Sequence, residues 1–238
     1  MDQLNLVSFI FLVVLFVLTP RGALRSARLL RQVEATGAPL PRMRMALSTM
    51  FALAVIWLLS SINAIAMGRS LFATGGAGLR EIALGAGAFV LLLGAIPLAR
   101  SMRTPEQDRR SLIYGMAPRN GREFALFVVI AVMAGVAEEA AYRGVAVWIL
   151  APVMGNVVPA MFLSAMAFAV AHAVQGGKNM ALIFVIAAVF HALVYFTGTL
   201  VIAMVVHAAY DIVAGYLAGL RAKQILAEDG VAGGSTPA

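Results

Sequence analysis

The sequence predicts an all-α polytopic membrane protein, a bundle of about seven transmembrane helices with an intramembrane polar cavity. Of its 238 residues, 62% are hydrophobic and 12% charged, and the mean hydropathy is +0.92. A soluble domain is about half apolar, so this composition excludes that class. Apolar runs of spanning length recur along the chain, and ionisable residues lie inside some of them. Cysteine is absent, which excludes disulfides, thiolate metal sites and thiol nucleophiles.

Seven apolar segments predict the spans, since a bilayer-crossing helix needs about 20 apolar residues. We expect the first to end at Pro20 and to be a retained anchor, because its basic residues follow the apolar run and do not precede it. The fourth carries the stretch GVAEEAAYRG in its middle. The predicted spans are Leu4–Leu18, Met45–Met67, Ile82–Ala99, Phe124–Leu150, Val157–Val174, Met180–Phe196 and Leu200–Leu220.

The distribution of positive charge predicts the orientation, with the N-terminus outside and the C-terminus in the cytoplasm. Fifteen of the 18 Lys and Arg residues fall on one side, and only Arg69 and Arg80 fall on the other. The basic charge thus reflects topology and anionic lipid, and no nucleic acid is expected as a partner. We expect an integral protein of a bacterial inner (cytoplasmic) membrane. The fifteen are Arg21, Arg25, Arg28, Arg31, Arg42, Arg44, Arg100, Arg103, Arg109, Arg110, Arg119, Arg122, Lys178, Arg221 and Lys223.

Two stretches have the composition of unpacked chain. The segment RSLFATGGAGLR, residues 69–80, is rich in glycine and is expected outside. The segment EDGVAGGSTPA, residues 228–238, is small and polar, which is typical of a disordered tail.

Six ionisable residues besides Arg143 fall within the predicted spans. Burying a charge in lipid costs at least a few kcal/mol, about 3 on insertion scales, so such groups face a cavity and pair with one another. They are Glu138, Glu139, Asp211, His172, His191 and His207.

Helical spacing assigns different partners to the two adjacent glutamates. Glu139 and Arg143 are four residues apart and share a helix face, which predicts an ion pair. Glu138 points elsewhere by this geometry and is left as a candidate base. The alternative is that both acids are structural and bond neighbouring helices.

The same spacing links residues on two later helices. Phe168 and His172 share one face, and Asp211 lies one turn from His207, where it can orient the imidazole. His191 has no acidic partner at helical spacing, so we interpret it as an interhelical hydrogen-bonding residue.

The three segments together resemble the CAAX-protease and bacteriocin-processing (CPBP) family of intramembrane endopeptidases, and in particular the type II CAAX prenyl endopeptidases. The family carries EExxxR, FxxxH and HxxxN/D in that order on successive helices. These correspond here to Glu138–Arg143, Phe168–His172 and His207–Asp211, with Gly144 after the arginine. The resemblance covers about residues 120–220, so we expect N-terminal helices and basic loops over 1–119, a catalytic membrane core over 120–223 and a flexible tail over 224–238.

The resemblance implies endopeptidase activity on a membrane-associated protein or peptide. It implies that Glu138 and His172 activate water and that His207 and Asp211 face the scissile carbonyl, with Glu139, Arg143 and Phe168 as structural support. Prenyl proteases usually have Asn where this chain has Asp211, and an ionised carboxylate cannot donate to an oxyanion. Asp211 must then be protonated, orient His207 or bind a metal.

A metal-free mechanism is favoured, because the zinc motif HExxH is absent. The alternative is zinc or iron held by Glu138, His172, His207 and Asp211, which offer two nitrogens and two carboxylates.

Two other classes of function are open on the sequence alone. Buried Glu, His and Asp residues also serve proton-coupled transporters, although no repeat symmetry is evident. A non-catalytic membrane scaffold or immunity protein is the other. The expected partners are membrane lipids and a membrane-associated protein or peptide substrate, whose identity the sequence does not indicate.

Overall fold

The computed structural model describes residues 5–36, 42–102, 104 and 116–233, and every regular element in these ranges is helical. Six apolar helical stretches are long enough to cross a membrane, and a seventh is shorter. The protein is therefore an integral membrane protein, as predicted. The six stretches are Leu6–Gln32, Arg42–Ala66, Leu79–Ser101, Gly121–Met154, Gly177–Thr197 and Leu200–Glu228, and the shorter one is Val157–Ala171.

The N-terminal span does not end at Pro20, so that prediction was wrong. Helix α1 (Leu6–Val13) continues through a π-helical turn, η1 (Val14–Leu18), into α2 (Thr19–Ala35). A proline lacks the N–H that an α-helix needs and clashes with the preceding turn. The π turn, in which Thr19 N–H and Oγ1–H both donate to Val14 O, lies directly before the proline and allows the helix to continue.

The loop after α3 (Arg42–Ala66) is packed, contrary to the prediction of an unpacked external segment. Leu71 is buried in the main core cluster, and Thr199 Oγ1 donates to the Ala73 carbonyl at 2.7 Å. The Arg69 guanidinium lies 5.0 Å from the centre of the Trp148 ring. The composition predicted flexibility, but these three contacts hold the loop on the end of the bundle.

The remaining helices follow in up-and-down order. Helices α4 (Leu79–Leu93) and α5 (Ala95–Ser101) form the third span, and α8 (Gly121–Glu138), η2 (Glu139–Val145) and α9 (Ala146–Met154) form the fourth without a break. Then come α10 (Val157–Ala171), the 3₁₀ turn η3 (Ala173–Gln175), α11 (Gly177–Thr197) and α12 (Leu200–Gly233).

Two of these helices differ in length from the prediction. Helix α10 has 15 residues, about 22 Å, so it is shorter than a bilayer core of about 30 Å. Helix α12 runs on to Gly233, past the predicted end at Leu220 and into the segment expected to be a tail. Residues 234–238 lie outside the described residues, as do Leu4, Arg103, Arg109 and Arg110 of the other predictions.

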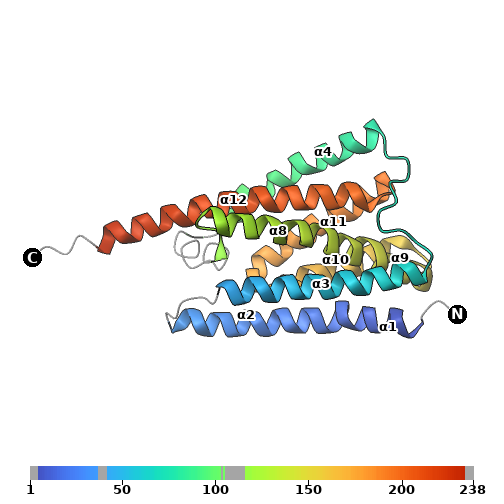
Figure 1. Ribbon diagram of the computed structural model, residues 1–238, viewed down its shortest axis with the longest axis horizontal. Coiled ribbons are helices and arrows are strands. Elements are labelled where there is room, and N and C mark those ends of the chain that lie inside the picture. The colour runs from blue at the N-terminus through green and yellow to red at the C-terminus, as the bar shows by residue number, and fades with distance from the viewer. Residues whose placement is uncertain (1–4, 37–41, 103, 105–115, 234–238) are drawn as a thin grey trace, which may run out of the picture.

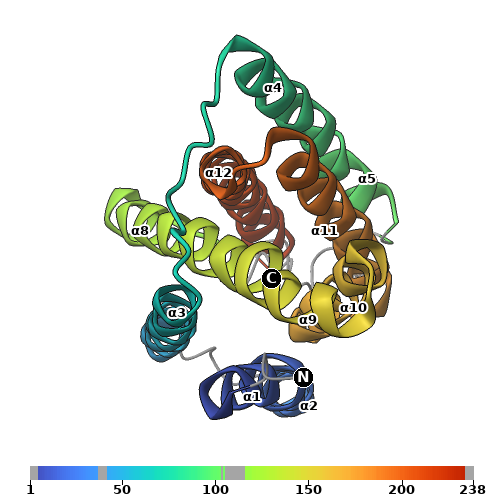
Figure 2. The same ribbon diagram turned by 90° about the vertical axis from the view of Figure 1, so that its right-hand side faces the viewer.

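Helix α12 lies inside the bundle, with α4, α8 and α11 around it (Figures 1 and 2). Helix α4 lies on the far side of α12 from α1 and α2 (Figure 2). Two long-range contacts show which helix ends lie together. Arg42 at the start of α3 pairs with Glu123 at the start of α8 at 2.8 Å, and Arg80 Nη1 at the start of α4 donates to Phe196 O at the end of α11 at 3.3 Å. This grouping agrees with the predicted alternation of helix directions.

Helices α8 and α12 approach closely because glycines lie at their contact. A Cβ added at Gly135 would lie 2.8 Å from the Met204 carbonyl oxygen and 2.9 Å from the Ala208 nitrogen. At Gly215 an added Cβ would overlap the Phe127 ring. Small residues at helix contacts let backbones approach within a membrane, and here the close contact sets the second half of α8 against the first half of α12.

Gly135→Ala should therefore destabilise the protein by about 1–3 kcal/mol, because the new methyl meets backbone atoms that cannot rotate away. The measurement is thermal unfolding of the purified protein in detergent. Gly87→Ala is the matched control, since an added Cβ there has nothing within 4 Å and should be neutral or stabilising. Equal melting temperatures for the two variants would contradict the close contact.

Candidate active site

The two adjacent glutamates lie where an α-helix changes to a π turn. Glu138 is the last residue of α8, and Glu139 is the first of η2, which closes with Ala146 N–H donating to Ala141 O. The buried Tyr142 carbonyl accepts a hydrogen bond of 2.7 Å from Ser164 Oγ of α10. Turns of this kind are rare in proteins overall, but those that occur often lie at functional sites. Nothing in the sequence predicted this one.

The predicted ion pair between Glu139 and Arg143 is present. Arg143 Nη1 lies 3.1 Å from Glu139 Oε1, and both side chains are fully buried. The guanidinium carbon lies 4.3 Å from the centre of the Phe168 ring and 5.2 Å from that of Phe190. The charge of Arg143 is thus held by one carboxylate and two aromatic faces, an arrangement that favours arginine over lysine.

His207 lies at the centre of the polar cluster. Its Nδ1–H donates to Glu139 Oε1 at 2.7 Å, and this is the same oxygen that pairs with Arg143. On the other side of the ring, Nε2 lies 3.5 Å from Asp211 Oδ2 and 3.8 Å from Glu138 Oε2. Three carboxylates therefore surround one imidazole.

The predicted separation of the two glutamates was only half right. Glu138 does lack the arginine, but it does not point to a different partner, because both glutamates reach His207. Glu138 lies nearest to His207 Nε2 and Glu139 to Nδ1, and Glu139 uses one oxygen for both Arg143 and His207. Its role in orienting His207 was missed, since 68 residues separate the two.

His172 reaches this cluster through Phe168. Its Nδ1–H donates to the Phe168 carbonyl at 2.8 Å, and the two rings lie 4.4 Å apart. Phe168 in turn packs edge-on to His207 at 6.4 Å. The His172 ring is half-buried and within electrostatic reach of Glu138.

Accessibility within the cluster changes along the helices. The side chains of Glu139 and Arg143 have no exposed surface, whereas 16% of Glu138 and 31% of Asp211 is exposed. Glu138 precedes Glu139 on α8, and Asp211 follows His207 on α12, so both partly accessible carboxylates lie toward the helix ends that carry Glu123 and Arg221. The structure thus brings these ionisable residues of the predicted spans together, and the polar cavity predicted around them stays a prediction.

The four residues named as the alternative metal ligands are not grouped as a metal site. Within the described ranges, no three His, Asp or Glu side chains are arranged so that they could hold a metal ion. Glu138 Oε2 and Asp211 Oδ2 lie 3.8 and 3.5 Å from His207 Nε2, and His207 Nδ1 is bonded to Glu139. The four residues as placed therefore do not fit a metal ion.

Helix α11 carries two buried residues, Phe190 and His191, for which the sequence predicted no role in the site. The Phe190 ring lies 5.0 Å from His207 at 32°, so it stacks on the ring while also facing Arg143. His191 is buried, but no hydrogen-bond partner reaches its Nε2 within the described chain. Its interpretation as an interhelical hydrogen-bonding residue is thus not supported at that nitrogen.

Arg143→Met should lower the free energy of unfolding by about 3–5 kcal/mol, because it leaves the buried Glu139 carboxylate with His207 alone and without its arginine. Adding Glu139→Gln removes the stranded charge, so the double variant should be more stable than Arg143→Met alone. Thermal unfolding of the wild type, the two single variants and the double variant in one detergent gives the coupling energy between the two residues. Additive effects would contradict a direct pair.

Comparison with known protein families gives a match over residues 120–213, described as "Rce1-like: Type II CAAX prenyl endopeptidase Rce1-like". Comparison with curated proteins and with solved structures gave no match. The matched range contains Glu138, Glu139, Arg143, Phe168, His172, His207 and Asp211 and ends two residues after the last of them. Residues 120–213 of this chain are a domain of the Rce1-like type II CAAX prenyl endopeptidase family.

Proposed function

We propose that the protein hydrolyses a peptide bond in a membrane-associated protein or peptide, with water activated by Glu138. Membership of the matched domain in a protease family supports the reaction class. The observation that carries the assignment of the base is the environment of Glu138. It lies outside the Glu139–Arg143 pair, faces His207 Nε2 at 3.8 Å and is partly accessible.

Glu138 and His172 are the pair that binds the attacking water. In its neutral form the His172 ring has its proton on Nδ1, which is held by the Phe168 carbonyl at 2.8 Å. This leaves the Nε2 lone pair as an acceptor for one water hydrogen, while Glu138 accepts the other. Glu138 takes the proton as the water oxygen attacks the carbonyl carbon.

His207 stabilises the oxyanion that this attack produces. Glu139 fixes the ring through Nδ1–H, so a proton on Nε2 points to the side where Glu138 and Asp211 lie. A donor preoriented in this way lowers the energy of the tetrahedral intermediate. When the intermediate collapses, the C–N bond breaks and the proton on Glu138 passes to the leaving amine.

Asp211 acts on His207 and does not contact the oxyanion. Its Oδ2 lies 3.5 Å from Nε2, close enough to attract the proton there but not to form a short hydrogen bond. The Asp211 carboxylate, in place of the usual asparagine, thus stabilises the positive charge of the His207 ring. The hydrogen bond to the oxyanion is donated by His207 itself.

The side on which the substrate enters follows from accessibility and charge. The partly exposed Glu138 and Asp211 lie toward the helix ends that carry most of the Arg and Lys residues. By the positive-inside rule this end faces the cytoplasm, with the N-terminus outside and the C-terminus inside. The substrate then approaches from the cytoplasmic face, which for a bacterial chain is that of the inner membrane.

Glu138→Gln should abolish cleavage, a loss of at least about 10³-fold, because an amide cannot take the proton from water. Since the substrate is unknown, the measurement is a comparison of new protein N-termini in membranes that contain the wild type or the variant. Glu81→Gln, at the opposite end of the bundle, is the control that should retain every cleavage.

Equal cleavage by Glu138→Gln and the wild type would contradict the assignment of the base. The same set of N-termini with and without the wild-type protein would instead favour a transporter or a non-catalytic scaffold. Normal accumulation and melting of the variant show that the loss is chemical.

Asp211→Asn should lower kcat about tenfold, the effect of losing one charge-assisted contact to His207, with little change in KM. Asp211→Leu should lower it further, because the side chain then makes no polar contact with the ring. Steady-state kinetics on a substrate identified from the N-termini separates the two constants. A variant with raised KM and unchanged kcat would place Asp211 in substrate binding.

A further inference from the structure

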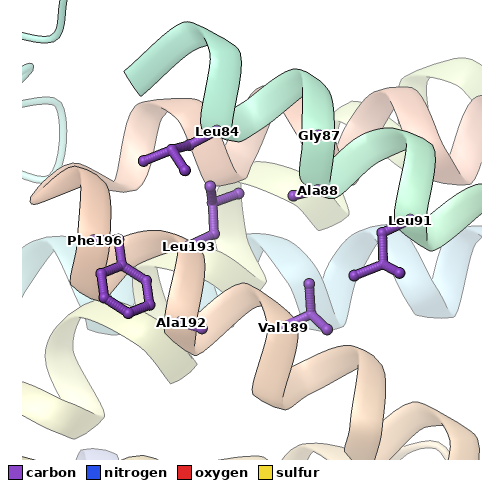
Figure 3. Close-up of a pocket in the computed structure, with 8 residues that line it drawn as sticks. All are labelled: Leu84, Gly87, Ala88, Leu91, Val189, Ala192, Leu193 and Phe196. Carbon is purple, nitrogen blue, oxygen red and sulfur yellow. The ribbon is translucent and has the colours of Figure 1, made fainter. Parts of the chain in front are cut away.

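An apolar groove runs between α4 and α11, away from the polar cluster (Figure 3). Its volume is about 180 Å³. Helix α4 contributes Leu84, Gly87, Ala88 and Leu91, and α11 contributes Val189, Ala192, Leu193 and Phe196. All eight lie within spans, so the hydrocarbon of the bilayer reaches the open side of the groove.

Small residues produce the groove. Gly85 packs α4 on α12, since a Cβ there would lie 2.7 Å from Ile202 Cγ2. On the adjacent face, Gly87 has nothing within 4 Å of an added Cβ, and Ala88 and Ala192 fill little space. The two helices pack on α12 and also on each other, while a furrow is left between their outer faces.

A cation lies above one end of this furrow. Arg80 precedes Leu84 by four residues and so belongs to the same stripe of α4 as Leu84, Gly87 and Leu91. Its Nη1 donates to the carbonyl of Phe196, the lining residue at the end of α11, and to Glu81 Oε1 at 2.9 Å. These contacts use one nitrogen of a guanidinium that has five N–H donors, and 67% of the side chain is exposed.

We propose that this groove binds one phospholipid of the surrounding bilayer, with an acyl chain in the furrow and the phosphate on Arg80. From Leu84 to Leu91 the furrow is about 10 Å long, and Arg80 adds about 6 Å at its outer end. An apolar slot that ends in a guanidinium matches the amphiphilic shape of a phospholipid, because guanidinium and phosphate form paired hydrogen bonds. The adjacent Glu81 carboxylate favours a zwitterionic headgroup over a purely anionic one.

The test is native mass spectrometry of the full chain in detergent, titrated with palmitoyl-oleoyl phosphatidylethanolamine. We expect one saturable adduct. Nothing lies within 4 Å of a Cβ added at Gly87, so Gly87→Leu should fill the groove and remove the adduct. Arg80→Gln should weaken the adduct about tenfold. The matched control for Gly87→Leu is Ala86→Leu, at the adjacent exposed position of α4. The matched control for Arg80→Gln is Arg69→Gln, a cation at the same end of the bundle. Both should bind as the wild type does.

Binding should also raise the melting temperature of the wild type and of both controls, but not that of Gly87→Leu. A ladder of weak adducts that is unaffected by Gly87→Leu would overturn the proposal, since it indicates unspecific annular lipid. A dimer that Gly87→Leu disrupts would also overturn it, because a second copy of the chain would then occupy the groove. Neither readout depends on peptidase activity, so failure here leaves the proposed function untouched.

Discussion

One carboxylate oxygen, Glu139 Oε1, organises the membrane core. It accepts from His207 Nδ1–H at 2.7 Å and lies 3.1 Å from Arg143 Nη1, in a side chain with no exposed surface. A buried charge without its partner costs several kcal/mol, so arginine and histidine must both be delivered to this point. Helices α8 and α12, and the π turn η2 between α8 and α9, are positioned by that requirement.

The packing around this oxygen follows from it. Histidine can reach Glu139 only if α12 lies close to α8, and Gly135 permits this by leaving the Met204 and Ala208 backbone room to approach. Arginine can stay buried only if its unpaired surface is covered, which the Phe168 and Phe190 rings do at 4.3 and 5.2 Å. Phe168 also supplies the carbonyl that fixes His172, so one aromatic residue links the charge pair to the second histidine.

Hydropathy and spacing predicted much of this molecule, because both are local properties. The helical class, the long fourth span and the Glu139–Arg143 pair need only the apolar runs and the i,i+4 rule. The contact of Glu139 with His207 depends on how two helices pack, and the continuation through Pro20 depends on a π turn. Neither feature can be predicted from a short stretch of sequence. The order of the three motifs indicated that their residues share a site, but it did not predict the contacts within that site.

The two glutamates differ in accessibility, although both reach His207. Glu139 has no exposed side-chain surface, and its Oε1 is shared by Arg143 and His207. Glu138 faces the same histidine from the other ring nitrogen, at 3.8 Å and with part of its surface exposed. An acid that is near a fixed imidazole, unpaired with arginine and open toward one end of the bundle is suited to exchange protons with water. Under the proposed function, the adjacent pair combines a fixed anchor and the base within a single turn.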